Sequence, residues 1–195
     1  MVKIGINGFG RLGKLILRAS LSFKDIEVVA INDPYINAEH MAYLLRYDTI
    51  HGAMNGEITP TKAGNLRING RDIQIYACRD LAKIPWKQAG AHTVIEAASR
   101  NLTANHARMH LHGGARRVVL ASGATQATSH SDLPTYIVGV NHTQYDPKHR
   151  AIAIASPTAS CLAPLLTVLD DQYGVREALA TAVLAMQPQH KVVDG

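Results

Sequence analysis

The chain has 195 residues, of which 47% are hydrophobic and 18% are charged, a composition that excludes a disordered or fibrous protein. The formal charge of +5 arises from Lys and Arg residues spread along the sequence without a dense block, so it favours small anionic ligands over nucleic acid. Two cysteines are too few for a disulfide framework, and no apolar stretch has the form of a signal peptide or a membrane span. We therefore expect a folded cytoplasmic protein with no membrane partner.

The first predicted elements are a strand, a helix and a second strand. Val2–Asn7 is a short apolar run that ends in glycines, as expected of a buried strand. In Arg11–Ser22 the apolar residues recur at helical spacing. Ile26–Ile31 is rich in β-branched residues and is closed by Asn32-Asp33-Pro34. This order predicts a βαβ unit of a parallel sheet.

The segments that follow continue the alternation. We expect a helix over Ala38–Leu45, and a hairpin in which Leu66–Ile68 and Ile73–Tyr76 flank Asn69-Gly70. Central strands are predicted at Thr93–Ala97 and Val118–Ala121, a helix at Asn105–Leu111 between them, and a polar loop over residues 123–134. Strands that alternate with helices in this way predict an open α/β sheet.

The last third of the chain predicts a further helix and strand. Ser156 is suited to cap a helix, Pro157 to occupy its first position, and Gly174 to follow its last turn. We therefore expect a helix that runs to Asp171, with a further strand over Ala178–Leu184.

The strongest motif is glycine-rich. Gly8, Gly10 and Gly13 form the pattern G-x-G-x-x-G where the first strand turns into the first helix. In such a loop the first glycine permits a tight turn, the second lets the backbone approach a pyrophosphate, and the third allows helix and sheet to pack closely. The helix N-terminus adds free N–H groups that attract an anion.

An acidic residue follows at the spacing that this motif requires. Asp33 lies roughly 20 residues after Gly13, at the end of the second strand, where a carboxylate can accept hydrogen bonds from ribose hydroxyls. The acid favours NAD over NADP. Together with the elements around it, the motif predicts a Rossmann-type dinucleotide-binding domain, whereas the alternative is a glycine-rich turn without a ligand.

Several segments together resemble the phosphorylating, NAD-dependent glyceraldehyde-3-phosphate dehydrogenases in order and spacing. They are Val2–Gly13, Val29–Pro34, Tyr47–Gly52, Arg79-Asp80, Gly139–His142, Cys161–Leu165 and Lys191–Gly195. The resemblance implies an NAD-binding Rossmann domain over residues 1–155 and the truncated start of an α+β catalytic domain over residues 156–195. It also implies that Arg11, Leu12, Asp33 and Arg79 line the NAD site beside the glycines, with Arg79 near the adenine.

The resemblance fails at the catalytic positions. In the family a cysteine thiolate attacks the aldehyde, a neighbouring histidine assists it, and the segment around the cysteine reads Ser-Cys-Thr-Thr-Asn-Cys-Leu-Ala-Pro. Here that segment begins Ser156-Pro157, so a proline occupies the nucleophile position. Leu184 occupies the histidine position, and Gln187 replaces a threonine of a phosphate site. We therefore expect an NAD-binding protein that is catalytically impaired.

Two alternatives stay open. In the first, the chain is an active NAD-dependent aldehyde oxidoreductase that uses Cys161, which lies one helical turn, about 5–6 Å, beyond Pro157. We expect Cys161 instead to be a buried helix residue. In the second, the chain is a non-catalytic interaction subunit, and a homo- or hetero-oligomer is compatible with all three interpretations.

Two other features have structural explanations. His106, His110 and His112 include a pair at the i, i+4 spacing of a helical metal site, but no acidic or thiol ligand accompanies them, so we expect a solvated helix end and no metal. Trp86 follows Ile84 and Pro85 and is expected to anchor a loop.

Overall fold

The computed structural model describes residues 1–98, 103–121 and 133–185, and within them the strands form one sheet of order β3-β4-β5-β2-β1-β6-β7-β9-β8. The strands are β1 Val2–Asn7, β2 Ile26–Asn32, β3 Ile58–Pro60, β4 Leu66–Ile68, β5 Arg71–Tyr76, β6 Thr93–Glu96, β7 Arg117–Leu120, β8 Thr135–Tyr136 and β9 Ala151–Ile154. The helices are α1 Arg11–Ser20, α2 Ala38–Arg46, α3 Ala104–His112 and α4 Pro157–Tyr173. Short 3-10 turns cover Leu81–Lys83 and His142–Gln144.

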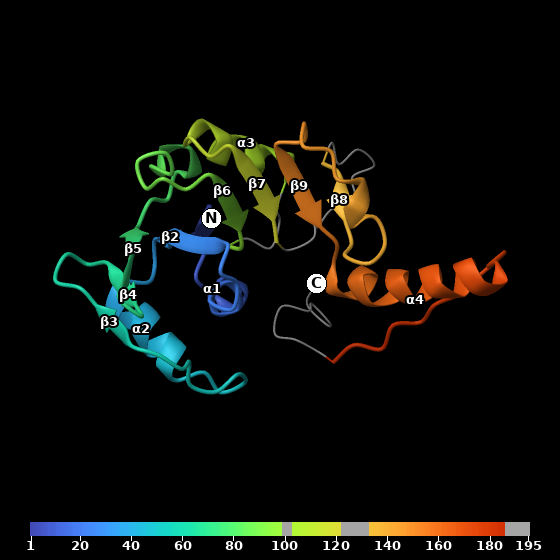
Figure 1. Cartoon of the computed structure of the whole chain (residues 1–195), viewed down its shortest axis with the longest axis horizontal. Coiled ribbons are helices and arrows are strands. Elements are labelled where there is room, and N and C mark those ends of the chain that lie inside the picture. Colours follow the sequence, from blue (N-terminus) through green and yellow to red (C-terminus); the bar gives the residue numbers. More distant parts are fainter. Residues whose placement is uncertain (99–102, 122–132, 186–195) are drawn as a thin grey trace, which may run out of the picture.

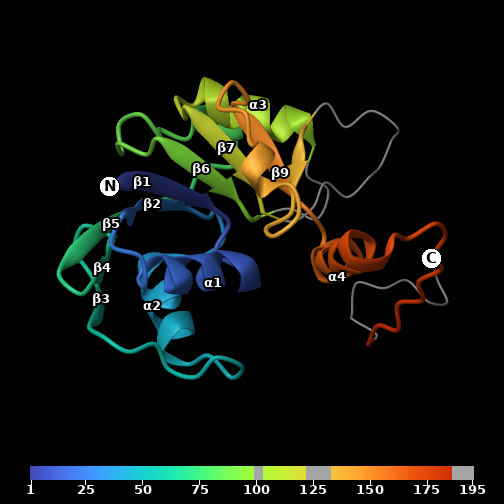
Figure 2. The ribbon, with the colours of Figure 1, turned by 45° about the vertical axis from the view of Figure 1, so that its right-hand side comes forward.

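The sheet is parallel from β5 to β8, and only the β3-β4-β5 end is antiparallel. Helices α1 and α2 lie on one face of it and α3 lies on the other (Figures 1 and 2). This arrangement confirms the predicted Rossmann-type α/β fold. Because the central strands are parallel, their carboxyl ends meet at one edge, which is where ligands bind in folds of this kind.

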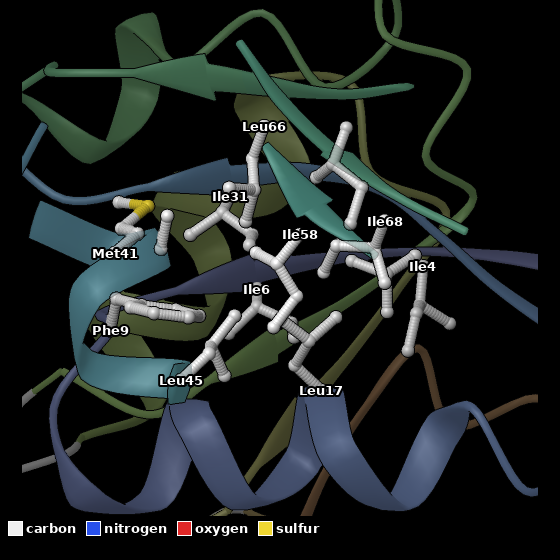
Figure 3. Close-up of a cluster of buried hydrophobic side chains, with 13 residues drawn as sticks. Ile4, Ile6, Phe9, Leu17, Ile31, Met41, Leu45, Ile58, Leu66 and Ile68 are labelled. Carbon is white, nitrogen blue, oxygen red and sulfur yellow. The ribbon is translucent and has the colours of Figure 1, made fainter. Parts of the chain in front are cut away.

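Two apolar cores separate the sheet from its helices. The first lies beneath α1 and α2 (Figure 3) and includes Ile4, Ile6, Phe9, Leu17, Ile31, Met41, Leu45, Ile58, Leu66 and Ile68. The second lies beneath α3 and includes Trp86, Ile84, Val94, Val118 and Leu120. Trp86 is fully buried, so its predicted role as an anchor is confirmed. A side chain at Gly5 would overlap its ring, at 2.6 Å from Trp86 Cζ3.

An ion pair and hydrogen bonds hold the loop after α2 against α1. Asp48 accepts hydrogen bonds from the backbone N–H groups of His51 and Ile50 and lies 3.4 Å from Lys14 Nζ. These hydrogen bonds, with the nearby ammonium, lower the pKa of Asp48 from 3.8 to about 2. Arg18, one turn beyond Lys14, donates to the carbonyl oxygens of His51 and Gly52. The segment Tyr47–Gly52 is therefore held against the helix that follows the glycine loop.

The structure confirms the predicted hairpin and the central elements. In the hairpin, Leu66 pairs with Ile73, and Asn69 and Gly70 adopt φ values of 49° and 79°, as expected for a two-residue turn of the I′ type. The predicted strands and helices up to Ala121 each form, with ends that match the prediction or differ from it by one or two residues.

The later part of the chain differs from the expectations. Strands β8 and β9 were not predicted, because β8 has two residues and β9 alternates Ala with Ile, and alanine is a weak strand former. The strand predicted at Ala178–Leu184 is wrong: no ladder forms there within the described residues, and Leu179 and Val183 are 97% and 93% exposed. A strand needs a hydrogen-bonding neighbour and a face to bury, and this segment has neither there. Most of the polar loop predicted at 123–134 lies outside the described residues.

Helix α4 continues from the end of β9 and runs away from the sheet (Figure 1). Ser156 Oγ accepts a hydrogen bond from the Ala159 N–H and Pro157 is the first helical residue, so the predicted start of the helix is confirmed. None of its residues is buried. Among the described residues, no helix is long and apolar enough to cross a bilayer.

Candidate functional site

Two of the three glycines shape the loop between β1 and α1. Gly8 has φ +90°, and a Cβ there would lie 2.4 Å from Ala98 Cα. A Cβ at Gly13 would lie 2.0 Å from the carbonyl oxygen of Gly8. Both distances are shorter than a van der Waals contact, so any larger residue would force the backbone apart. These glycines allow α1 to begin directly against the end of β1.

Gly10 differs from both of them. Its φ of −74° is open to any residue, and no heavy atom of the described chain lies within 4 Å of the position of a Cβ. Neither the backbone nor the packing therefore requires a glycine here. The space lies at the N-terminus of α1, which has no side-chain cap. The helix start thus borders an open space, and helix N-termini are where phosphates can bind.

Asp33 joins the glycine loop to the end of β2. The residue is 7% exposed, and its two carboxylate oxygens accept hydrogen bonds from the N–H groups of Phe9 at 2.8 Å and Tyr35 at 2.9 Å. A carboxylate offers about four acceptor sites, so two remain for hydroxyl donors. The predicted spacing from Gly13 therefore brings the carboxylate directly beside the glycine loop.

A pocket of about 340 Å³ opens at this edge of the sheet, and its walls include Gly8, Gly10, Asp33, Tyr35 and Arg79. The guanidinium carbon of Arg79 lies 5.5 Å from the centre of the Tyr35 ring. A flat cation and an aromatic ring make a wall suited to a planar heterocycle. A larger hollow of about 710 Å³ adjoins the pocket across Asp33 and Tyr35 but contains no residue of the glycine loop.

The seven residues predicted to bind the cofactor lie along this edge. Arg11 and Leu12 form the first turn of α1, next to the open space at Gly10; Arg11 is exposed and Leu12 is half-buried. The structure thus brings the three glycines, Asp33 and Arg79 around one pocket or its supporting turn.

The sequence interpretation missed a buried polar network under the pocket. Asn7 Nδ2 donates to Glu96 Oε2 at 2.6 Å, and Asn32 Nδ2 donates to Asn7 Oδ1 at 2.8 Å. His110 Nε2 lies 2.7 Å from Glu96 Oε2, and all four side chains are buried. The expectation of a solvated helix end is therefore wrong for His110, because the inner face of α3 lies on the sheet. A polar residue that ends each of three apolar strands was the signal available in the sequence.

Pro157, which stands at the position of the expected nucleophile, lies at the same edge of the sheet. Since β9 is parallel to β7 and β6, the N-terminus of α4 starts at the carboxyl ends of the strands. Pro157 is exposed there and presents no polar group. Cys161 is exposed, and the expectation that it is buried is wrong, because no layer of the described chain covers α4. Leu184 is also exposed, and Gln187 lies outside the described residues.

The described ranges contain no group of three or more His, Cys, Asp and Glu side chains that could hold a metal ion. His106 Nδ1 instead contacts the backbone N–H and the hydroxyl of Thr103 in a capping arrangement at the start of α3. His106 therefore caps the start of α3, and His110 forms part of the buried polar network.

Comparison with known proteins gives consistent results. The family model described as "Glyceraldehyde 3-phosphate dehydrogenase, NAD binding domain" matches residues 2–104. The chain is 45% identical to a glyceraldehyde-3-phosphate dehydrogenase of Mycosarcoma maydis over 194 residues, which is 100% of this chain and 56% of the relative. It is also 45% identical to glyceraldehyde-3-phosphate dehydrogenase 2 of Agaricus bisporus over 195 residues, which is 100% of this chain and 56% of that relative. It is 44% identical over 190 residues to the cytosolic glyceraldehyde-3-phosphate dehydrogenase of Scenedesmus vacuolatus, which is 97% of this chain and 59% of the relative. The chain thus spans a little over half the length of these relatives.

Proposed function

This chain belongs to the glyceraldehyde-3-phosphate dehydrogenase family, and from that premise we propose that it holds NAD by the adenosine half of the cofactor without catalysing the oxidation of an aldehyde. NAD is the cofactor of the matched domain. Residues 1–155 act as the NAD-binding domain and residues 156–195 as the start of a catalytic domain. We place the protein in the cytoplasm, in keeping with the cytosolic relative.

The observation that carries the proposal is the pairing of an empty Cβ position at Gly10 with the carboxylate of Asp33 in one pocket. The open space and the uncapped start of α1 fit a pyrophosphate, which the N–H groups of Arg11 and Leu12 would receive. The free acceptor sites of Asp33 fit the ribose hydroxyls. Arg79 fits the adenine, on the side where it stacks on Tyr35.

The proposed loss of catalysis follows from two side chains. NAD, when bound, would accept a hydride, but only from a substrate that a nucleophile has first converted into a hemithioacetal. Pro157 has no thiol, and its ring nitrogen is part of the peptide bond. Leu184 has no group that takes or gives a proton. Neither half of a thiol–imidazole pair is therefore present at these positions.

The alternative of an active oxidoreductase depends on Cys161. Its exposure leaves the thiol open to solutes. Its position, however, is four residues after Pro157, about 6 Å further along the helix. A reacting atom misplaced by even 1 Å loses about 100-fold in rate, so this thiol is a poor substitute for the missing nucleophile.

Calorimetric titration with NAD tests the proposal directly. We expect saturable binding by the unmodified chain, weakened about 10- to 100-fold by Asp33→Ala, because hydrogen bonds to a charged group contribute about 1.5–3 kcal/mol each. Asp33→Asn is the matched control. It keeps one acceptor oxygen for Phe9 or Tyr35, so its NAD affinity should lie between those of the unmodified chain and Asp33→Ala. Absence of binding by a chain that melts cooperatively would contradict the proposal.

The second alternative, an interaction subunit, is favoured by the apolar surface of α4. Leu165, Val168 and Tyr173 are more than half exposed. Apolar side chains gathered on one helix promote association, so we expect the chain to form homo- or hetero-oligomers. Sedimentation velocity at increasing concentration should show a rising mean mass, and Leu165→Gln with Val168→Gln should reduce it. A single monomer peak at every concentration would be the opposite result.

A further inference from the structure

His110 is held between two fixed partners. Its imidazole is completely buried, with Trp86 Nε1 at 3.1 Å from Nδ1 and Glu96 Oε2 at 2.7 Å from Nε2. An indole N–H can only donate, so Nδ1 must be the unprotonated acceptor. The proton of a neutral imidazole is therefore on Nε2 and is donated to Glu96. Trp86 thus fixes which nitrogen of His110 faces the carboxylate.

Glu96 connects His110 to the wall of the pocket through hydrogen bonds. Besides the bond from His110, its oxygens accept hydrogen bonds from Asn7 Nδ2 at 2.6 Å and from the Ala98 N–H at 2.7 Å. Ala98 forms part of the pocket wall and lies against Gly8, at the point where a Cβ on Gly8 would collide with it. Asn7 is the last residue of β1 before the glycine loop. The carboxylate therefore holds both sides of the turn that shapes this loop.

We propose that His110 is a positioning residue for the NAD pocket, which it orders through Glu96 although it does not line the pocket itself. The proposal rests on the proposed NAD-binding function. A buried carboxylate is held more firmly in one orientation the more of its acceptor sites are matched by donors. His110 supplies the donor on the side away from the ligand, so its removal leaves Asn7 and Ala98 to share a carboxylate that can rotate.

Two substitutions at this position separate positioning from packing. His110→Gln keeps an N–H donor close to the position of Nε2, whereas His110→Leu keeps apolar volume and removes the donor. Leu66→Ala, in the core on the other face of the sheet, is the control for loss of stability alone. NAD affinity is measured by calorimetry, and protection of the Ala98 amide is measured by hydrogen exchange without NAD.

For His110→Leu we expect NAD to bind about 10-fold more weakly and the Ala98 amide to exchange about 10-fold faster than in the unmodified chain. His110→Gln should restore most of both values. Leu66→Ala should lower the melting temperature and leave both values unchanged. If His110→Leu does not fold, Trp86→Phe replaces it: this variant deletes the indole donor and frees the imidazole to turn, so Ala98 should again lose protection.

Equal Ala98 protection in His110→Leu and His110→Gln would overturn the positioning role, as would equal NAD affinity in the two variants. Unchanged Ala98 protection in Trp86→Phe would do the same. A different result, in which the unmodified chain binds no NAD while Ala98 responds as expected, would contradict the proposed function and leave the role of His110 in ordering the turn supported.

Discussion

The purified chain, supplied with glyceraldehyde 3-phosphate, NAD and phosphate, is expected to form NADH at least about 10,000-fold more slowly than the Mycosarcoma maydis relative under the same conditions. Removal of a catalytic nucleophile or its base alone can cost about a million-fold, so a factor of about 10,000 is the lower bound of the expected loss. Here both positions are changed, to Pro157 and Leu184. The two losses are not additive, because the nucleophile and its base act as a unit. Changing both is therefore expected to cost about as much as changing either alone.

The variants that interpret this assay are Cys161→Ala and Asp33→Ala. Any residual rate that is unaffected by both comes from a contaminating host dehydrogenase. A rate that Cys161→Ala abolishes would instead support the active alternative, with the exposed thiol as nucleophile. The measurement is the absorbance of NADH under initial-rate conditions, with the enzyme concentration set high enough to detect one turnover per hour.

The second large effect is expected at Gly10. Gly10→Ala should weaken NAD binding by at least about 100-fold, because a Cβ would occupy the space in which the backbone approaches the pyrophosphate. The same change should cost less than about 1 kcal/mol of folding free energy, since φ is ordinary and the new methyl group meets no atom of the described residues.

Gly13→Ala provides the contrast. Its Cβ would collide with the carbonyl oxygen of Gly8 at 2.0 Å, so folding should lose about 2 kcal/mol or more. Denaturant titration of each variant, followed by calorimetry with NAD under conditions where both are folded, measures the two effects separately. If Gly10→Ala binds NAD as tightly as the unmodified chain, the open space at the start of α1 does not receive the pyrophosphate.

The glycine loop could be predicted because its chemistry is local. Gly8, Gly10 and Gly13 lie within six residues, at a strand-to-helix turn that the apolar periodicity already located. Asp33 could be predicted as the ribose-binding acid because this motif places an acidic residue at a fixed spacing after the last glycine. What the motif could not separate was the reason for each glycine: backbone conformation at Gly8, packing at Gly13, and an empty space at Gly10.

The buried network could not be predicted because its members are distant in sequence. Asn7 and Glu96 are separated by 89 residues, and His110 is joined to them only through the packing of α3 on the sheet. A histidine beside other histidines suggested a metal site or solvent, and neither is correct at this position. The short strands β3, β8 and β9 were missed for a related reason, since pairing with a neighbour stabilises them more than their own residues do.

The single tryptophan of this chain is also its natural optical probe. Trp86 is fully buried in the core beneath α3, with its indole N–H bonded to His110, while the core beneath α1 and α2 contains no tryptophan. Its emission therefore monitors one face of the sheet. Unfolding curves recorded by this emission and by far-ultraviolet circular dichroism, which senses both faces, will coincide only if the two cores melt together.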